Sequence, residues 1–161
     1  MLVRDLLAAD WPAVHKIYEE GIRSGDATFE TELPSREAWD AAHPELRLVA
    51  ERDGSVVGWA ALSPVSDRCC YEGVSEVSVY VAEAARGSGV GRALLERLVE
   101  RSEDAGYWTL TAGVFPENEA SLRVHLACGF REVGVRERVG QLAGVWRDVL
   151  LLERRSEHVG T

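Results

Sequence analysis

The sequence predicts an α/β fold, and three observations support this class. Some stretches alternate apolar with polar residues, which is typical of half-buried strands, while others repeat apolar residues at helical spacing. The two patterns follow one another along the chain, as they do in α/β proteins. The chain has 161 residues, 46% of them hydrophobic, which suffices for one packed domain. We therefore expect a single domain over residues 1–161, with the element order β-α-α-β-β-β-α-β-α-β-β.

The N-terminal part is expected to hold one strand and two helices. Leu2–Asp5 is a short strand candidate. A helix follows, with Asp10 as its expected cap and Gly25 as its end. A second helix begins at Ser35 and ends at His43, because the residue before a proline is pushed out of helical geometry.

The central part is expected to hold three strands and a helix. Residues 47–52 and 56–62 read as strands joined by Asp53-Gly54, a strong hairpin turn signal. Residues 74–81 alternate small or polar residues with valine and form the clearest strand. An amphipathic helix is predicted over residues 93–105.

The C-terminal part continues the alternation. We expect a strand over residues 108–114, a helix over 118–127, and strands over 130–138 and 145–152. The polar residues 154–161 are expected to form a frayed tail.

Composition excludes several classes of function. Lys and Arg total 18 against 27 Asp and Glu, a net charge of −9, which argues against nucleic-acid binding. Two of the three cysteines, Cys69 and Cys70, are adjacent, so a disulfide framework is not expected and a reducing compartment fits better. No cysteine or histidine spacing indicates a metal site. The sequence lacks a signal-peptide pattern and any apolar run of about 20 residues, so we expect a cytoplasmic protein without membrane contact.

One glycine-rich segment stands between the clearest strand and the amphipathic helix. Its residues are Arg86, Gly87, Ser88, Gly89, Val90, Gly91 and Arg92. Glycines there permit close approach of a ligand to the backbone, and a helix N-terminus favours an anion. A Walker loop is excluded because no Gly-Lys-Ser/Thr follows, and a Rossmann fingerprint fails because Arg92 occupies the third glycine position. A strand-to-helix turn without any ligand remains the structural alternative.

The wider pattern resembles the GCN5-related N-acetyltransferase (GNAT) family. The segment from Arg86 to Gly91 matches the family's Arg/Gln-x-x-Gly-x-Gly/Ala pyrophosphate loop. The downstream helix is similar as well, with Asn118, Ser121 and His125 followed by Gly129-Phe130. The resemblance implies a GNAT fold, in which a central mixed, mostly antiparallel sheet of about six or seven strands is flanked by about four helices. It also implies acetyl-CoA as co-substrate.

Within that family the sequence looks like the phosphinothricin and methionine sulfoximine acetyltransferases. The likeness runs from residues 27–32 through Ser63-Pro64 and 76–81 to residues 146–149. It implies transfer of an acetyl group from acetyl-CoA to the primary amine of a small amino-acid-like substrate. Homodimers are also implied.

The resemblance assigns roles to individual residues. Glu76 is the implied general base, acting directly or through a water; an exposed strand residue is its structural alternative. An arginine is suited to grip a substrate carboxylate. The implied substrate-binding residues are Phe29, Glu30, Arg68, Tyr71, Glu76, Val77 and Ser78. The implied cofactor-binding residues are Val79, Tyr80 and Val81, the glycine-rich segment from Arg86 to Arg92, Asn118, Ser121 and His125.

Some features leave alternatives open. His125 is a candidate general acid for the leaving thiolate, although a helical histidine is more often a packing residue. In the stretch from Gly140 to Trp146 phosphinothricin-type enzymes often carry an aromatic and a basic or histidine residue, and the absence of a polar group near Leu142 and Ala143 weakens the expectation for phosphinothricin itself. An acyl-CoA-binding sensor and a protein or peptide N-acetyltransferase are the alternative functions.

Overall fold

The computed structural model describes residues 1–161, and its elements follow the predicted order. The strands are β1 (Leu2–Asp5), β2 (Arg47–Arg52), β3 (Ser55–Pro64), β4 (Val74–Val81), β5 (Thr109–Val114), β6 (Arg131–Leu142) and β7 (Val145–Arg155). The helices are α1 (Trp11–Ser24), α2 (Arg36–Ala42), α3 (Val90–Asp104) and α4 (Glu119–Ala127). Short 3-10 turns are η1 (Ala8–Asp10), η2 (Cys69–Tyr71) and η3 (Glu83–Ala85).

All seven strands belong to one mixed sheet with the order β1-β2-β3-β4-β5-β7-β6. Every neighbouring pair is antiparallel except β4 and β5, which are parallel. The parallel pair requires a crossover, and α3 provides it between the two strands. The expected sheet of six or seven mostly antiparallel strands with four helices is confirmed.

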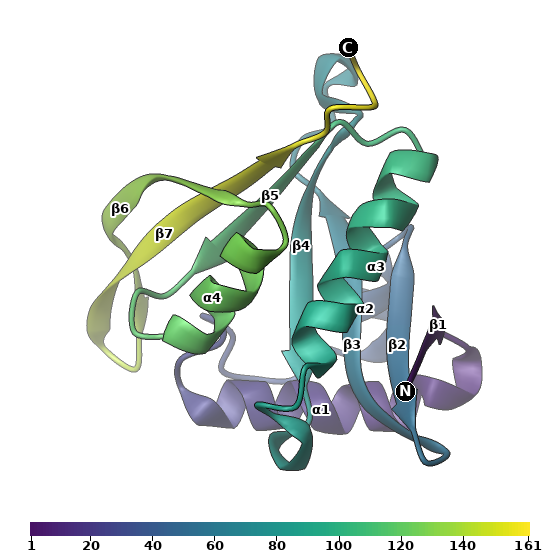
Figure 1. The fold of residues 1–161 in the computed structure, drawn as a ribbon. Helices are drawn as coiled ribbons and strands as arrows, with labels where there is room; N and C mark the ends of the chain where they lie inside the picture. The colour runs from purple at the N-terminus through teal and green to yellow at the C-terminus, as the bar shows by residue number, and fades with distance from the viewer.

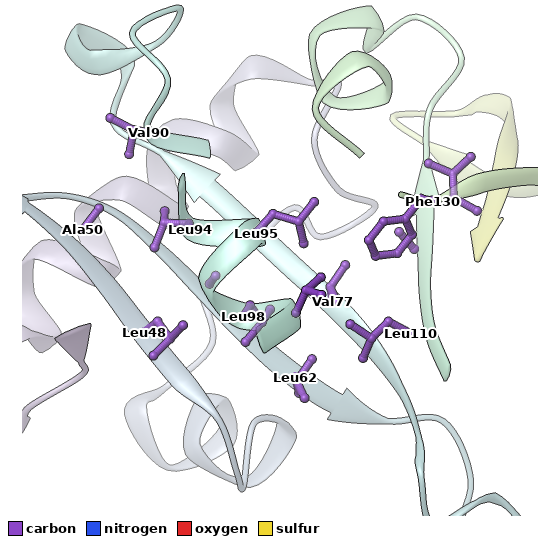
Figure 2. Packing of buried hydrophobic residues seen from close by; sticks show 14 of the residues in the cluster. Leu48, Ala50, Leu62, Val77, Val90, Leu94, Leu95, Leu98, Leu110 and Phe130 are labelled. Atoms are coloured by element: carbon purple, nitrogen blue, oxygen red, sulfur yellow. The ribbon is translucent and has the colours of Figure 1, made fainter. Parts of the chain in front are cut away.

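Helices cover both faces of the sheet, with α3 and α4 on one face and α2 on the other (Figure 1). Alternation along β3 explains both layers, because Ala60 and Leu62 pack toward α3 while Trp59 and Ala61 pack toward α1 and α2. The α3 leucines Leu94, Leu95 and Leu98 lie against the first layer and are fully buried (Figure 2). Burial of each such leucine contributes about 1.5–3 kcal/mol to folding.

Most helices and turns begin or end at the glycine and capping residues from which their bounds were predicted. Gly25 has φ 76° at the end of α1, and the Asp53-Gly54 turn has φ values of 52° and 77°. The Ser35 side chain accepts a hydrogen bond from the N–H of Ala38 at the start of α2. The conformation at these positions depends on only a few neighbouring residues, so it can be predicted from the sequence.

Two expectations about helix starts are corrected by the structure. Asp10 stands at the N-cap position of α1 as expected, but its side chain does not cap the helix; it pairs with Arg4 at 2.7 Å and accepts a hydrogen bond from the N–H of Leu7. Helix α3 begins at Val90 rather than residue 93, because Gly89 takes a left-handed φ of 84° and turns the chain into the helix at once.

The expected frayed tail is also corrected in its first half. Strand β7 continues to Arg155, and the next residue, Ser156, is buried. The Arg155 guanidinium donates to the carbonyls of Val159 and Gly160, which folds the tail back onto the sheet end. Pairing with β5 up to Thr109 explains why this end is ordered. No helix of the chain is both long and apolar enough to cross a membrane.

Candidate functional site

The site begins where β4 and β5 separate. The two strands pair over Val74–Thr109, Ser75–Leu110 and Glu76–Thr111, and no further pair follows although both strands continue. The strands spread apart beyond this point, with α4 near the opening (Figure 1). Past Glu76, the edge of β4 that faces β5 therefore presents backbone N–H and C=O groups without a strand partner.

A cleft of about 1380 Å³ occupies the space between the separated strands. Its walls come from β4, β5, the start of α3, the face of α4, the loop after α1, and the β6–β7 hairpin. Most of the residues predicted for the site line it: Phe29, Glu30, Glu76, Val77, Ser78, Val79, Tyr80, Val81, Arg86, Gly87, Gly89, Val90, Gly91, Arg92, Asn118, Ser121 and His125.

One end of the cleft is formed by the N-terminus of α3. Gly89 precedes the helix and offers no side chain to its first N–H groups, which have no intrahelical acceptor. A side chain at Gly87 or Gly89 would meet nothing within 4 Å, so the backbone there is open to a ligand. Arg86 and Arg92 add positive charge, and Arg92 is paired with Glu96 at 2.7 Å. This end of the cleft suits an anionic group such as a phosphate.

Glu76 lies at the point where the strands separate, opposite Ser63 on β3 and Thr111 on β5. Alternation places it on the α1–α2 face with Ser78 and Tyr80, whereas Val77 packs into the α3 core. Water reaches its carboxylate through the cleft, but the surrounding walls raise the pKa of Glu76 by desolvation. The nearby positive charge of Arg136 on β6 opposes that shift. A carboxylate with a raised pKa is suited to accept a proton.

His125 is held with a defined tautomer. Its Nδ1 lies 2.7 Å from the carbonyl oxygen of Ser121, so Nδ1 carries the proton and donates it. The ring is buried and packs edge-on against Phe130 at 5.2 Å. Desolvation lowers the pKa of His125, which favours the neutral ring. In this state Nε2 carries no proton, so the geometry favours a packing or acceptor role over that of a general acid.

One wall of the cleft is formed by the loop after α1. Phe29 packs edge-on against Phe115 at 4.9 Å and lies close over Gly140 of β6. The Asn118 side chain donates to the carbonyl of Asp26 at 3.1 Å and also caps α4 by accepting from Ser121. Asn118, which the sequence predicts to bind the cofactor, therefore makes two hydrogen bonds that hold the structure of the protein.

Three predicted residues lie elsewhere. The Arg68 guanidinium rests over the ring of Tyr71 at 5.4 Å, and Tyr71 lines a separate hollow of about 520 Å³ beside Trp108. The Ser88 hydroxyl donates to the carbonyl of Ala85 and does not line the cleft.

Sequence reasoning missed residues of the β6–β7 hairpin that line the cleft, among them Arg136, Val139 and Gly140. Their positions depend on an irregular pairing of β6 with β7, which no local pattern displays. Leu142 and Ala143 lie at the tip of this hairpin, outside the cleft, and Ala143 has φ 50°. No group of three or more His, Cys, Asp or Glu side chains is arranged to hold a metal ion.

Comparisons with known proteins agree on one family. Residues 3–130 match the family model described as Acetyltransferase (GNAT) family. A phosphinothricin N-acetyltransferase from Alcaligenes faecalis is 41% identical, covering 94% of this chain and 81% of the relative. A methionine sulfoximine/methionine sulfone acetyltransferase from Pseudomonas paraeruginosa is 30% identical, covering 94% of this chain and 92% of the relative.

Solved structures give the same picture. A GNAT superfamily phosphinothricin acetyltransferase from Sinorhizobium meliloti, in complex with AcCoA, superposes with a TM-score of 0.90 at 30% identity, covering 99% of this chain and 90% of its own. A ribosomal-protein-alanine N-acetyltransferase from Brucella melitensis has a TM-score of 0.90 at 36% identity, covering 97% of this chain and all of its own.

Proposed function

Because the chain belongs to the Acetyltransferase (GNAT) family, we propose that it transfers an acetyl group from acetyl-CoA to the primary amine of a small amino-acid-like substrate of the phosphinothricin or methionine sulfoximine type. The chain is thus an acetyltransferase, and acetyl-CoA is its acetyl donor. The observation that carries the proposal is one cleft with an anion-binding helix N-terminus at one end and Glu76 at the point where β4 and β5 separate.

The residues present fit acetyl-CoA along the length of the cleft. Gly87, Gly89 and the first N–H groups of α3 are proposed to hold the pyrophosphate, supported by Arg86 and Arg92. The unpaired edge of β4 from Val79 to Val81 is proposed to hydrogen-bond the pantetheine arm, as a peptide strand would. The Val79 and Val81 side chains pack against the α3 core, which leaves their backbone groups available to the pantetheine arm. His125 is proposed to accept a hydrogen bond from acetyl-CoA through its Nε2 atom.

Glu76 is proposed as the general base. Acetyl-CoA supplies an activated thioester carbonyl, and the attacking amine must first lose a proton. An α-ammonium has a pKa near 8. Because the pKa of Glu76 is raised, the difference between the pKa values of the ammonium and the carboxyl group is smaller, which favours proton transfer. A backbone N–H on the free β4 edge is proposed to donate to the carbonyl oxygen as negative charge develops.

The decisive experiment is Glu76→Gln, measured as release of free thiol from acetyl-CoA in the presence of L-methionine sulfoximine. We expect a fall in kcat on the order of 100-fold or more, with an unchanged dissociation constant for acetyl-CoA. Glu72→Gln is the matched control, because Glu72 is exposed and lies outside the cleft. Unchanged turnover in Glu76→Gln would rule out the base assignment.

A second candidate is a protein N-acetyltransferase, which the likeness to the ribosomal-protein-alanine enzyme favours. A small substrate is favoured instead on the proposal that the Phe29–Phe115 pair in the cleft wall leaves too little room for a peptide. Peptides with an N-terminal alanine, tested in the same thiol assay, distinguish the two. An acyl-CoA sensor would bind acetyl-CoA without turning over any amine.

A homodimer is also proposed. The β6–β7 hairpin exposes several large apolar side chains, and clusters of such side chains often mark protein interfaces: Val133, Val135, Val139, Val145 and Trp146. Light scattering on wild type and Trp146→Ser tests this proposal, with a dimer expected for the wild type and a monomer for the variant.

We further propose that residues 1–161 form a single domain in the cytoplasm. One sheet spanning β1 to β7 supports the single domain, and three free cysteines suit a reducing compartment. Cell fractionation with an epitope-tagged chain tests the location.

A further inference from the structure

Positive charge in the cleft is unevenly placed. Four arginines line it: Arg86, Arg92, Arg123 and Arg136. Arg86 and Arg92 belong to the turn and first residues of α3, while Arg123 lies on α4 and pairs with Glu119 at 3.6 Å. Arg136 comes from β6 and lines the same cleft as Glu76, and its side chain forms no ion pair or hydrogen bond within the protein. It is therefore a free cation at the end of the cleft where the amine is proposed to react.

The backbone that carries Arg136 is fixed by an irregularity in the hairpin. Arg136 lies opposite Val149, and Gly140 lies opposite Arg147, so four residues on β6 advance against two on β7. Arg138 within this bulge has φ 45°, and its N–H donates to the Asp148 carboxylate at 2.7 Å. Bulges near active sites commonly redirect side chains. This one sets the register in which Arg136 and Gly140 both line the cleft.

The surroundings place Arg136 on the substrate side of the sheet. Its strand partner Val149 packs over Gly113 of β5, 3.2 Å from where a side chain would begin there. Val149 and Arg136 lie on the same face, which is also the face of Glu76. That the Arg136 charge lowers the pKa of Glu76 agrees with this proximity.

We propose that Arg136 binds the α-carboxylate of the amine substrate. The inference rests on the proposed function and names how an amino acid would be recognised. An α-amino acid carries its ammonium and carboxylate on one carbon, so its site needs a proton acceptor and a cation a short distance apart. Glu76 and Arg136, which line one cleft on the same face of the sheet, are the acceptor and the cation available there, and a guanidinium can bind a carboxylate through two parallel hydrogen bonds. Arg68, the sequence candidate for this task, lies over Tyr71 outside the cleft.

The test compares wild type with Arg136→Gln, Arg136→Lys and the control Arg138→Gln, whose side chain is exposed and outside the cleft. The substrates are L-methionine sulfoximine, L-phosphinothricin, and the amine that corresponds to methionine sulfoximine without its carboxyl group. In Arg136→Gln we expect KM for both amino acids to rise on the order of 10- to 100-fold. KM for the decarboxylated amine and for acetyl-CoA should stay unchanged, Arg136→Lys should recover part of the loss, and Arg138→Gln should behave as wild type.

Each other result has a distinct meaning. Equal KM values for wild type and Arg136→Gln would overturn the inference. A rise confined to phosphinothricin would overturn it too, because Arg136 would then contact the phosphinate side chain. Wild type that acetylates none of the amino acids would refute the proposed function and this inference together, whereas wild-type turnover that survives Arg136→Gln unchanged refutes this inference alone.

Discussion

The guanidinium of Arg147 lies over the ring of Phe115, with Cζ 4.2 Å from the ring centroid. The same side chain donates to the carbonyl of Gly25 at 3.0 Å and to the carboxylate of Asp26 at 2.8 Å. It therefore joins β7 to the loop after α1 and to the residue after β5. These are three walls of the cleft, and one half-buried arginine holds them together.

Arg147→Leu should loosen this junction. Asp26 and Glu117 are 54% and 58% exposed, so their ion pairs with Arg147 contribute little. The main losses are the hydrogen bond to Gly25 and the contact with the ring, and we expect a destabilisation of about 1–2 kcal/mol. Chemical denaturation measures this loss. Arg131→Leu, which breaks a pair whose arginine is 67% exposed, should cost less than about 0.5 kcal/mol. Equal losses in the two variants would contradict the role of Arg147.

The pH dependence of the reaction should report the environment of Glu76. A base must be deprotonated to act, so kcat/KM should fall as the pH drops through the pKa of Glu76. Arg136 lowers that pKa, while desolvation raises it. Arg136→Gln removes the lowering influence, so the acid limb of kcat/KM should move to higher pH.

This profile is best measured with the decarboxylated amine, so that loss of carboxylate binding does not interfere. Arg138→Gln should leave the acid limb where the wild type has it. A limb that stays in place in Arg136→Gln would show that another group controls it.

Gly73→Ala should be strongly destabilising. A side chain at Gly73 would begin 2.1 Å from the ring of Trp108, closer than atoms can approach. We expect a loss of about 1–3 kcal/mol as the ring shifts. Gly134→Ala is the matched control, because nothing lies within 4 Å and its φ is not positive. Thermal melts of the two variants should differ by several degrees.

Gly89→Ala should weaken acetyl-CoA binding as well as folding. Its φ of 84° strains any other residue, at a cost of about 1–2 kcal/mol, and a methyl group would project toward open space at the cleft end. Gly144→Ala shares the strain, with φ 78° and open surroundings, but lies at the tip of the β6–β7 hairpin. Similar melting temperatures with weaker acetyl-CoA affinity only in Gly89→Ala are expected from calorimetry. Equal affinities would place the cofactor elsewhere.

Local chemistry made much of the fold predictable. The alternation in β4, the capping serine at Ser35 and the Asp53-Gly54 turn act over a few residues, and all three were confirmed. Glu76 was singled out by the family resemblance, because its pattern alone, a charged residue in an apolar strand, also fits an exposed strand residue. The extended end of β7 was missed because its partner, β5, lies far away in the sequence.

The unpredicted part of the site depends on long-range register. Arg136 lines the cleft because a bulge, held by Asp148, sets the pairing of β6 with β7. Arg68 lies outside the cleft because the turn η2 stacks it on Tyr71. Neither outcome follows from spacing, since both depend on which distant segment a side chain meets.

The separation of β4 from β5 also couples ligand binding to folding. Only three residue pairs join the two halves of the sheet, and a ligand bound along the free edge of β4 would act as an additional strand between them. Saturating such a site adds RT ln(1 + [L]/Kd) to the free energy of unfolding, about 2.7 kcal/mol at 100 times Kd. The backbone amides of residues 77–81 should then exchange their hydrogens more slowly when acetyl-CoA is bound. Local opening of the sheet would thus be least frequent while acetyl-CoA is bound.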